Sequence, residues 1–323
     1  MPRPNVFAAA LRALDAGRGV AIAAVTGASG STPRHLGARM AVAADGEQWG
    51  TVGGGKIEQL CVEAAKQVAA GGEPRVVRQH LVRDLAMCCG GSMEVAITPA
   101  GPSREVIARL ADAGERLVLV TPLDGGPLSV RPPRDGDPKP HHPAIVDGAL
   151  VERLGRGERV IVFGLGHVAR TLGPHLAQLG FHVIACDDNE TGAAAAGAPW
   201  AHQILESFDA REVEKQLGGF GPDDHVLIVT RDHSIDQQLL EQLIGHAQLG
   251  YLGMIGSRGK IGRFRKRLEA KGLFDETTWR RLRAPIGLDI GAETPEEIAI
   301  AIAAELIAHR RRGEPQAGDW SIA

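Results

Sequence analysis

The hydrophobic and polar positions in the first half of the chain predict short strands interleaved with two helices. Apolar residues recur at helical spacing through 6–16 and again through 57–69. Strands are predicted at 20–26, 39–43, 49–52, 76–82, 93–98 and 117–121. Loops rich in glycine and proline separate these segments. The first half is therefore predicted to be a mixed α+β domain.

The pattern changes near residue 159 to short apolar strands that alternate with helices. The strands are predicted at 160–163, 183–186, 226–229 and 251–255, and a last helix begins at the capping-box sequence 294–297. Such alternation favours a Rossmann-like, doubly wound parallel sheet. The predicted fold class is α/β, with an N-terminal mixed α+β domain followed by this Rossmann-like domain.

Five prolines between residues 131 and 143 mark the predicted boundary between the two halves. Proline cannot continue a helix and cannot donate to a sheet ladder. We therefore predict an N-terminal domain over 1–130, a Pro-rich linker over 131–150 and the Rossmann-like domain over 151–323.

Composition narrows the classes of function. The 323 residues include 36 Lys and Arg against 39 Asp and Glu, and only 4% are aromatic. A chain this balanced is not expected to bind nucleic acid or an anionic membrane. It shows no apolar run long enough to span a membrane and no secretion-signal pattern, and its four cysteines are expected to be reduced thiols. We expect a cytoplasmic protein.

The second half carries a glycine fingerprint in the context that the fold requires. Gly164, Gly166 and His167 follow a predicted strand and open a helix, and Asp187 ends the next strand. In dinucleotide-binding folds such glycines let a phosphate approach the helix N-terminus, and the acid binds a ribose hydroxyl. The glycines equally serve the turn alone. His233, at the sheet edge where ligands bind, either acts as an acid or base or caps the next helix.

Glycines in the first half predict a second anion-binding region. Gly53, Gly54 and Gly55 precede Lys56, and Glu58 stands in the first turn of the following helix. The pattern is like the opening of a Walker loop, but the hydroxyl residue that should follow the lysine is missing, which argues against an ATPase. Three consecutive glycines still expose backbone amides to an anion.

Upstream of these glycines, a loop and the strand after it supply further donors. Ser31, Arg34 and Arg39 offer hydroxyl and guanidinium groups suited to a phosphate or to the edge of a pterin. The alternative interpretation is a turn with solvated arginines.

Adjacent cysteines and glycines, Cys88, Cys89, Gly90 and Gly91, form the most informative tetrapeptide. Their spacing does not match zinc sites or thioredoxin-like redox centres. A thiol beside glycine amides is able to ligate a soft metal or to carry sulfur, whereas a buried cysteine simply packs. Successive side chains of an extended segment point to opposite faces, so we expect one thiol to face the glycine loops, with Cys89 preferred, and the other to pack inward.

Taken together, these motifs resemble the xanthine dehydrogenase accessory protein family (XdhC/CoxI) over nearly the whole chain. The resemblance rests on 30–40, 53–58 and 88–91 in the first half and on 164–168, 187–188, 233–236, 253–258 and 285–298 in the second. The last block is long and the most specific. The chain departs from the family pattern at Asn189, where arginine is usual, and at Arg231, where histidine is frequent.

The resemblance implies a molybdenum cofactor chaperone, which is an accessory protein rather than an enzyme. Such a protein binds molybdopterin and holds it while a cysteine desulfurase replaces an oxo ligand by sulfur. It then delivers the cofactor to a xanthine dehydrogenase-type molybdenum hydroxylase. Cys89 or Cys88 is the candidate molybdenum ligand. We also expect a homodimer.

Two alternatives stay open. One is an NAD(P)-dependent oxidoreductase that uses the Rossmann-like domain, which makes NAD(P) or another nucleotide a second candidate ligand. The other is a structural partner that docks on a hydroxylase without binding a cofactor.

Overall fold

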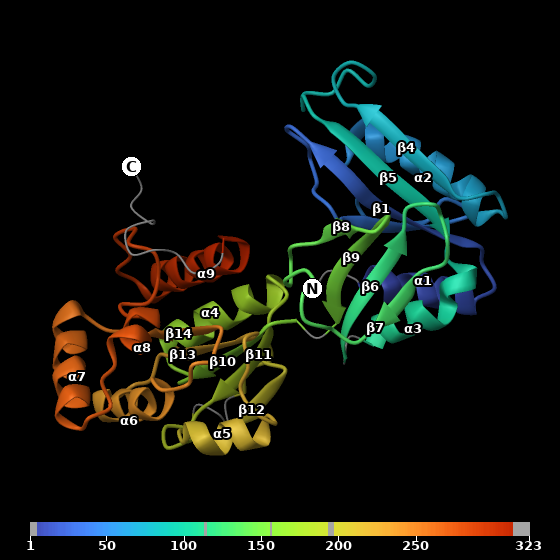
Figure 1. The fold of residues 1–323 in the computed structure, drawn as a ribbon. Coiled ribbons are helices and arrows are strands. Elements are labelled where there is room, and N and C mark those ends of the chain that lie inside the picture. The colour runs from blue at the N-terminus through green and yellow to red at the C-terminus, as the bar shows by residue number, and fades with distance from the viewer. Residues whose placement is uncertain (1–4, 113–114, 156, 193–196, 313–323) are drawn as a thin grey trace. The chain divides into compact units, whose positions relative to one another are not determined.

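The computed structural model describes residues 5–112, 115–155, 157–192 and 197–312. The chain divides after residue 156 into two compact units, each described by itself (Figure 1). We call residues 3–156 the N-terminal unit and the part from residue 157 onward the C-terminal unit. None of the described helices is long and apolar enough to cross a membrane.

A five-stranded antiparallel sheet carries most candidate residues of the N-terminal unit. Its order is β3-β2-β1-β5-β4, formed by β1 (Val20–Ser29), β2 (Arg39–Ala43), β3 (Gln48–Gly50), β4 (Arg75–His80) and β5 (Ser92–Pro99). Helix α2 (Gly55–Ala69) packs on one face, against Met40 and Val42. Side chains alternate along a strand, so Arg39 and Ala41 of β2 point to the opposite face.

The opposite face of this sheet shares a core with two helices and a second sheet. The helices are α1 (Val6–Asp15) and α3 (Arg104–Asp112), and the short 3-10 helix η1 (Gly101–Ser103) precedes α3. The second sheet has the antiparallel order β7-β6-β9-β8, formed by β7 (Ser129–Arg131), β6 (Arg116–Pro122), β9 (Ala149–Gly155) and β8 (Ala144–Val146).

The Pro-rich segment lies inside the N-terminal unit rather than between the units. Residues 132–143 connect β7 to β8, and β9 then pairs with β6 along its whole length. The division after residue 156 therefore falls beyond the predicted linker over 131–150. Proline does exclude ladder pairing in 132–143, but the chain resumes pairing as soon as the prolines end.

A six-stranded parallel sheet forms the centre of the C-terminal unit. Its order is β12-β11-β10-β13-β14-β15, formed by β10 (Arg159–Phe163), β11 (His182–Cys186), β12 (Gln203–Leu205), β13 (Asp224–Ile228), β14 (Tyr251–Met254) and β15 (Leu282–Arg283). The helices are α4 (His167–Gln178), α5 (Ala210–Gln216), α6 (His233–Leu243), α7 (Arg258–Ala270), α8 (Glu276–Arg281) and α9 (Pro295–Arg312). β10 and β13 lie at the centre of the sheet. From β10 the chain continues through β11 and β12 toward one edge, and from β13 it continues through β14 and β15 toward the other, as in a doubly wound sheet.

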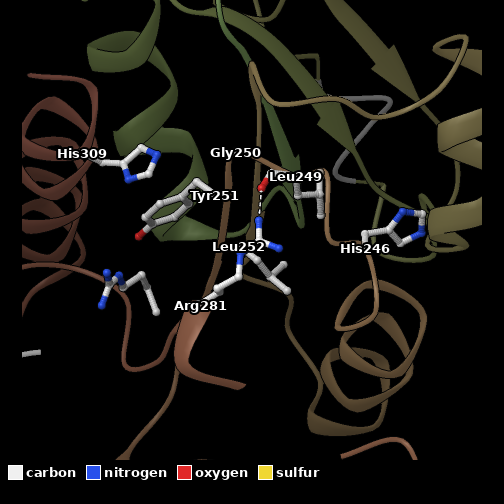
Figure 2. Close-up of a pocket in the computed structure, with 8 residues that line it drawn as sticks. His246, Leu249, Gly250, Tyr251, Leu252, Arg281 and His309 are labelled. Atoms are coloured by element: carbon white, nitrogen blue, oxygen red, sulfur yellow. Dashed lines mark hydrogen bonds between the residues drawn. The ribbon is translucent and has the colours of Figure 1, made fainter. Parts of the chain in front are cut away.

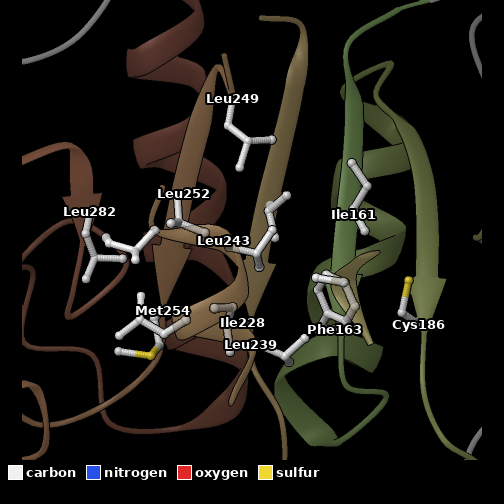
Figure 3. Packing of buried hydrophobic residues seen from close by; sticks show 14 of the residues in the cluster. Ile161, Phe163, Cys186, Ile228, Leu239, Leu243, Leu249, Leu252, Met254 and Leu282 are labelled. Carbon is white, nitrogen blue, oxygen red and sulfur yellow. The ribbon is translucent and has the colours of Figure 1, made fainter. Parts of the chain in front are cut away.

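Helices cover both faces of the parallel sheet, and this explains the continuous apolar runs of its strands. Ile161 and Phe163 pack with α5, α6 and α7 on one face (Figure 3). Val160 and Val162, which alternate with them, pack with α4 and α9 on the other. The predicted α/β fold class is confirmed, with antiparallel sheets in the N-terminal unit and a parallel Rossmann-like sheet in the C-terminal unit.

Candidate functional site

Three loops of the N-terminal unit that are distant in sequence lie against one another. The amide of Gly91 donates a hydrogen bond of 2.9 Å to the carbonyl of Ser31. A Cβ at Gly53 would lie 2.7 Å from Cγ of Pro33, and one at Gly55 would lie 3.2 Å from Cε of Met87. The segments 30–34, 53–55 and 87–91 therefore form one surface, which we call the three-loop surface.

Glycine is required where these loops touch. A Cβ at Gly91 would lie 2.3 Å from the carbonyl oxygen of Ser29, so no side chain fits there. Gly53, Gly54 and Gly55 have φ angles of 139°, 75° and 66°, a backbone region that side chains disfavour. The neighbouring Gly90 is exposed, and a Cβ there would meet nothing within 4 Å.

The carboxylate of Glu58 holds the glycine loop from the inside. Its Oε2 accepts hydrogen bonds from the amides of Val52 at 3.0 Å and Gly54 at 3.1 Å, and from the hydroxyl of Thr51. Burial alone would raise the pKa of Glu58, but these donors outweigh burial and lower it. The hydroxyl oxygen of Thr51 accepts from the amide of Gly53 at 3.0 Å. The amides of Gly53 and Gly54, two of the three glycines expected to face an external anion, are therefore used within the chain.

Two cations remain at the three-loop surface. Arg34 is half-buried, with its Cγ 3.6 Å from the position of a Cβ on Gly53, and Lys56 is exposed in the first turn of α2. Neither makes an ion pair with any described residue. N-cap Gly54 has no side chain to cap α2. This end of the surface therefore presents positive charge beside the first amides of a helix, which together attract an anion.

Arg39 is not part of this surface. Its guanidinium pairs with the carboxylate of Glu152 on β9, and its Cζ lies 5.0 Å from the ring centre of Phe7. The side chains of Arg39 and Glu152 are 9% and 6% exposed, so the pair lies in the core. Burial raises the pKa of Glu152, although the charge of Arg39 opposes the shift. Because β2 alternates, Arg39 points away from the face that carries α2.

The vicinal thiols lie in different surroundings. Cys88 is exposed, whereas Cys89 is half-buried and packs with Met87 against the core beneath α2. This agrees with opposite faces for successive side chains, but it makes Cys88 the outward thiol instead of the preferred Cys89. The remaining cysteines, Cys61 and Cys186, are buried, and burial raises the pKa of the Cys61 thiol to about 12. Cys88 is thus the thiol most open to a ligand.

In the C-terminal unit, the glycine fingerprint lies at the carboxyl edge of the sheet. Gly164 has a φ of 107°, and a Cβ there would lie 2.6 Å from the carbonyl oxygen of Val229. Gly166 is the N-cap of α4, and the space beside it is open. His167 begins the helix and is exposed. This backbone suits the approach of a phosphate.

The acid that should bind a ribose is already engaged. Asp187 is 3% exposed, and its two oxygens accept the amides of Leu165 and Asn189, each at 3.0 Å. The next residue, Asp188, receives both terminal nitrogens of Arg231 at 2.8 Å. This contact lowers the pKa of Asp188. Both aspartates therefore stabilise the loops around the fingerprint.

His233 begins α6 without capping it, since Asp232 is the N-cap and accepts the amide of Ser234. Its side chain is 72% exposed, and its Nδ1 lies 3.9 Å from Oδ2 of Asp236. Asp236 is buried and pairs with the buried ammonium of Lys260. The fingerprint and His233 share one edge of the sheet, but they belong to a different unit from the three-loop surface.

A small pocket lies at the amino edge of β14, on the side opposite the fingerprint (Figure 2). It has a volume of about 20 Å³, enough for a water molecule but not for a cofactor. Figure 2 shows Arg281 directed at the carbonyl of Leu249, which accepts its hydrogen bond at 2.5 Å. The pocket contains none of the predicted site residues. Nowhere in the described residues do three His, Cys, Asp or Glu side chains gather to hold a metal ion.

Sequence reasoning missed the partners that fix these sites. Glu152 lies 113 residues from Arg39, and Lys260 lies 24 residues from Asp236. Neither acid–base pair has a local sequence signal, because each partner lies on a different element. Only the period of two along a strand places Arg39 on the same face as Ala41.

Two family models match the chain. The model described as the XdhC and CoxI family matches residues 13–80, in the N-terminal unit. The model described as the XdhC Rossmann domain matches residues 160–306, in the C-terminal unit. The chain belongs to the XdhC/CoxI family. The family prediction made from the sequence is confirmed.

Three curated relatives match this XdhC/CoxI chain over different shares of their length. It is 30% identical over 309 residues to the uncharacterized protein YqeB of Escherichia coli, and 31% identical over 163 residues to a probable xanthine dehydrogenase component of Bacillus subtilis. It is 23% identical over 310 residues to the molybdenum cofactor insertion chaperone PaoD of Escherichia coli. These matches cover 94%, 50% and 94% of this chain, and 46%, 46% and 88% of the relatives. The matched segments thus span about half the length of the first two relatives.

A solved structure shows that this XdhC/CoxI chain resembles a relative in fold as well as in sequence. The crystal structure of a xanthine dehydrogenase from Bacillus halodurans matches with a TM-score of 0.76 and 26% sequence identity, and the match covers 97% of each chain. The motifs of both units therefore belong to a fold that a relative shares over nearly its full length.

Proposed function

We propose that the N-terminal unit binds the molybdenum cofactor as cargo, at the three-loop surface. One observation carries this proposal: the loops 30–34, 53–55 and 87–91 meet, and their meeting gathers an exposed thiol and two cations that pair with no described residue. Relatives named for molybdenum cofactor insertion and for xanthine dehydrogenase support the same role. The protein would then be an accessory protein rather than an enzyme.

The donors of the surface fit the chemistry of molybdopterin. Its phosphate needs cationic and amide donors, which Arg34, Lys56 and the first amides of α2 provide. A thiolate would supply a sulfur ligand to its molybdenum, and Cys88 presents the exposed thiol. Ser31, exposed beside them, supplies a hydroxyl that is able to hydrogen-bond a pterin edge. Glu58 does not contact the cargo but shapes the loop.

We further propose that the protein holds the cofactor for sulfuration by a cysteine desulfurase and then delivers it to a xanthine dehydrogenase-type molybdenum hydroxylase. A carrier must release what it binds. Two surface cations and one thiol make few contacts, so they hold the cargo without a closed cage of ligands. The exposure of Cys88 leaves the cargo accessible to both partner proteins.

The test is anaerobic purification of the full chain from cells that make the cofactor, followed by measurement of molybdenum and pterin per chain. Arg34→Ala and Lys56→Ala should each lower retention about tenfold, since each removes a charge-assisted contact. Arg75→Ala is the matched control, because Arg75 is an exposed cation on β4 of the same unit. If the unmodified chain retains neither molybdenum nor pterin, or if both variants retain them fully, the proposal is wrong.

A further inference from the structure

Strand β4 forms the longest open edge of the described sheets. The other edge strands, β3, β7, β8, β12 and β15, have two or three residues each, whereas β4 has six. Proteins usually keep open edges short, or interrupt them with proline or a bulge, because the unpaired backbone groups of an edge recruit other chains. β4 has no proline and pairs with β5 in unbroken register over residues 75–80. Its outer edge pairs with none of the described strands, so it is open to an added strand.

A groove runs along this edge, between β4 and helix α2. It has a volume of about 590 Å³ and is lined by residues 75–79 of β4 and by Leu60, Glu63, Ala64 and Gln67 of α2. Its apolar lining is accessible, since Leu60 and Val76 are 41% and 36% exposed. Side chains of a strand added to β4 would alternate between the two faces of the sheet, so every second one would lie toward α2. The groove therefore suits an extended segment with apolar side chains.

The helix and the strand that form the groove both lead to the three-loop surface. The chain leaves this surface along α2, turns and returns along β4, and the loop after β4 carries Cys88 (Figure 1). Leu60 lies one turn beyond Lys56 on the same side of α2, since four residues separate them. Val82, in the loop after β4, is a further large apolar side chain and is 46% exposed. The groove therefore begins beside the proposed cargo site.

The charges of the groove indicate the kind of segment that it binds. Arg75 is exposed at the far end of the groove and forms no ion pair with a described residue. Glu63 pairs with Lys66 at 3.1 Å, so the charge left unpaired in the lining is positive and favours an acidic segment. β4 carries two arginines and no acidic residue, so pairing with β4 of a second copy would bring like charges together. These charges argue for a foreign segment over a second copy.

We propose that this groove binds an extended segment of a partner protein, apolar in the middle and acidic at its ends, which adds to β4 as a sixth strand of the sheet. Backbone hydrogen bonds to β4 supply affinity, and the contacts with Leu60, Val76 and Arg75 supply the choice of segment. The role of the partner rests on the proposed function. A segment held here places its owner next to the cargo, as sulfuration or delivery of the cofactor requires.

The test uses the full chain without cofactor and a synthetic peptide as the probe. The peptide is short and capped at both termini, with alternating valine and threonine in the middle and glutamate at both ends. Hydrogen–deuterium exchange over residues 75–80 should slow at least about fivefold in its presence, because an added strand protects the outer amides of β4. Fluorescence anisotropy of the labelled peptide gives the dissociation constant.

Two control peptides separate strand addition from general attraction. One has lysine in place of glutamate, and the other keeps the sequence but is N-methylated at every amide, so that it cannot donate hydrogen bonds to β4. Each should bind at least about tenfold more weakly than the probe, the first through charge and the second through loss of the backbone ladder.

Variants of the chain locate the binding site. Leu60→Glu should raise the dissociation constant of the probe at least about tenfold, because it places a carboxylate in the apolar lining. Arg75→Glu should raise it about tenfold by repelling the acidic end of the peptide. Val146→Glu is the matched control, because Val146 is 44% exposed on β8, an edge strand of the other sheet in the same unit. Thermal unfolding of each variant checks that the fold is kept.

The proposal is overturned if exchange over residues 75–80 does not slow, if the N-methylated peptide binds as well as the probe, or if Leu60→Glu binds the probe unchanged. It is also overturned if the chain self-associates and Leu60→Glu abolishes this association, since the groove would then be a contact between copies. The probe experiment needs no cofactor, so its outcome does not depend on whether the chain retains molybdenum and pterin.

Discussion

The amide of Gly91 lies 2.9 Å from the carbonyl oxygen of Ser31 and donates its hydrogen bond there, which joins the cysteine loop to the loop after β1. Sixty residues separate the two in sequence. The contact leaves no room for a side chain on Gly91, because a Cβ there would lie 2.6 Å from the carbonyl oxygen of Ser31, and exposed Cys88 lies in the same loop. It is the structural basis for treating the separate motifs of the N-terminal unit as one site.

The first prediction concerns this contact. Gly91→Ala should destabilise the fold by about 1–3 kcal/mol, because the new Cβ would overlap the carbonyl oxygen of Ser29. Gly90→Ala is the matched control and should change stability by less than about 0.5 kcal/mol, since a Cβ there meets nothing. Urea unfolding of both variants measures the difference. Equal stability of the two would show that the loops do not pack as described.

A second prediction follows from the lowered pKa of Glu58. Its stabilising contribution should be fully present above the ordinary glutamate value of 4.5 and should be lost as the pH falls through the lower pKa of the folded state. Glu58→Gln should therefore cost about 1–3 kcal/mol at neutral pH and progressively less below pH 4.5. Unfolding free energies of both proteins across this range provide the measurement. A difference that does not shrink with acid would contradict the role of the carboxylate.

The third prediction separates the two thiols. Cys88→Ser should lower molybdenum and pterin retention while leaving stability unchanged, because Cys88 is exposed. Cys89→Ser should leave retention near normal and cost about 1 kcal/mol or more, because it exchanges a packed thiol for a hydroxyl at the core. Metal and pterin analysis and thermal unfolding of each variant distinguish the roles. Full retention in the double variant would exclude ligation of molybdenum by either thiol.

The fourth prediction tests the buried pair of Arg39 and Glu152. Arg39→Ala should destabilise the protein by about 3–5 kcal/mol, because Glu152 stays buried without its counter-charge. In that variant the folded pKa of Glu152 lies further above 4.5, so the penalty is present above that pKa and disappears as acid protonates the carboxyl. Arg39→Met/Glu152→Leu should be more stable than Arg39→Ala alone. The reverse order would indicate that Arg39 does not act through Glu152.

The fifth prediction concerns Gly166. The space beside it is open, so Gly166→Val should fold normally but obstruct the approach of an anion to α4. We expect weaker binding of any nucleotide or phosphate by the C-terminal unit, with pterin retention mostly intact. Calorimetric titration with NAD(P)H and pterin analysis of the same variant measure the two effects. Equal loss of both ligands, with stability unchanged, would mean that they share a site.

The sequence by itself determined the class of the fold and the central strands of both units. The continuous burial of Val160, Ile161, Val162 and Phe163 is encoded locally, because a strand covered on both faces must be apolar at every position. The glycines of both units also predicted the positions of turns, since only glycine adopts positive φ angles without cost. Strands β7, β8 and β9 around the Pro-rich segment were not predicted. β7 and β9 pair with β6, and β8 pairs with β9, and no local pattern indicates these pairings.

Only the tertiary structure decided which side chains work together. In the fold, Arg39 pairs with Glu152 and lies away from the three-loop surface. Glu58 accepts hydrogen bonds from the amides of Val52 and Gly54, and Asp187 accepts one from the amide of Leu165. The tertiary structure also exposed Cys88 rather than Cys89. These contacts depend on which sheet faces and which loop ends come together in the folded chain. A local sequence pattern indicates which residues of a strand share a face, but not which residue of another element they contact.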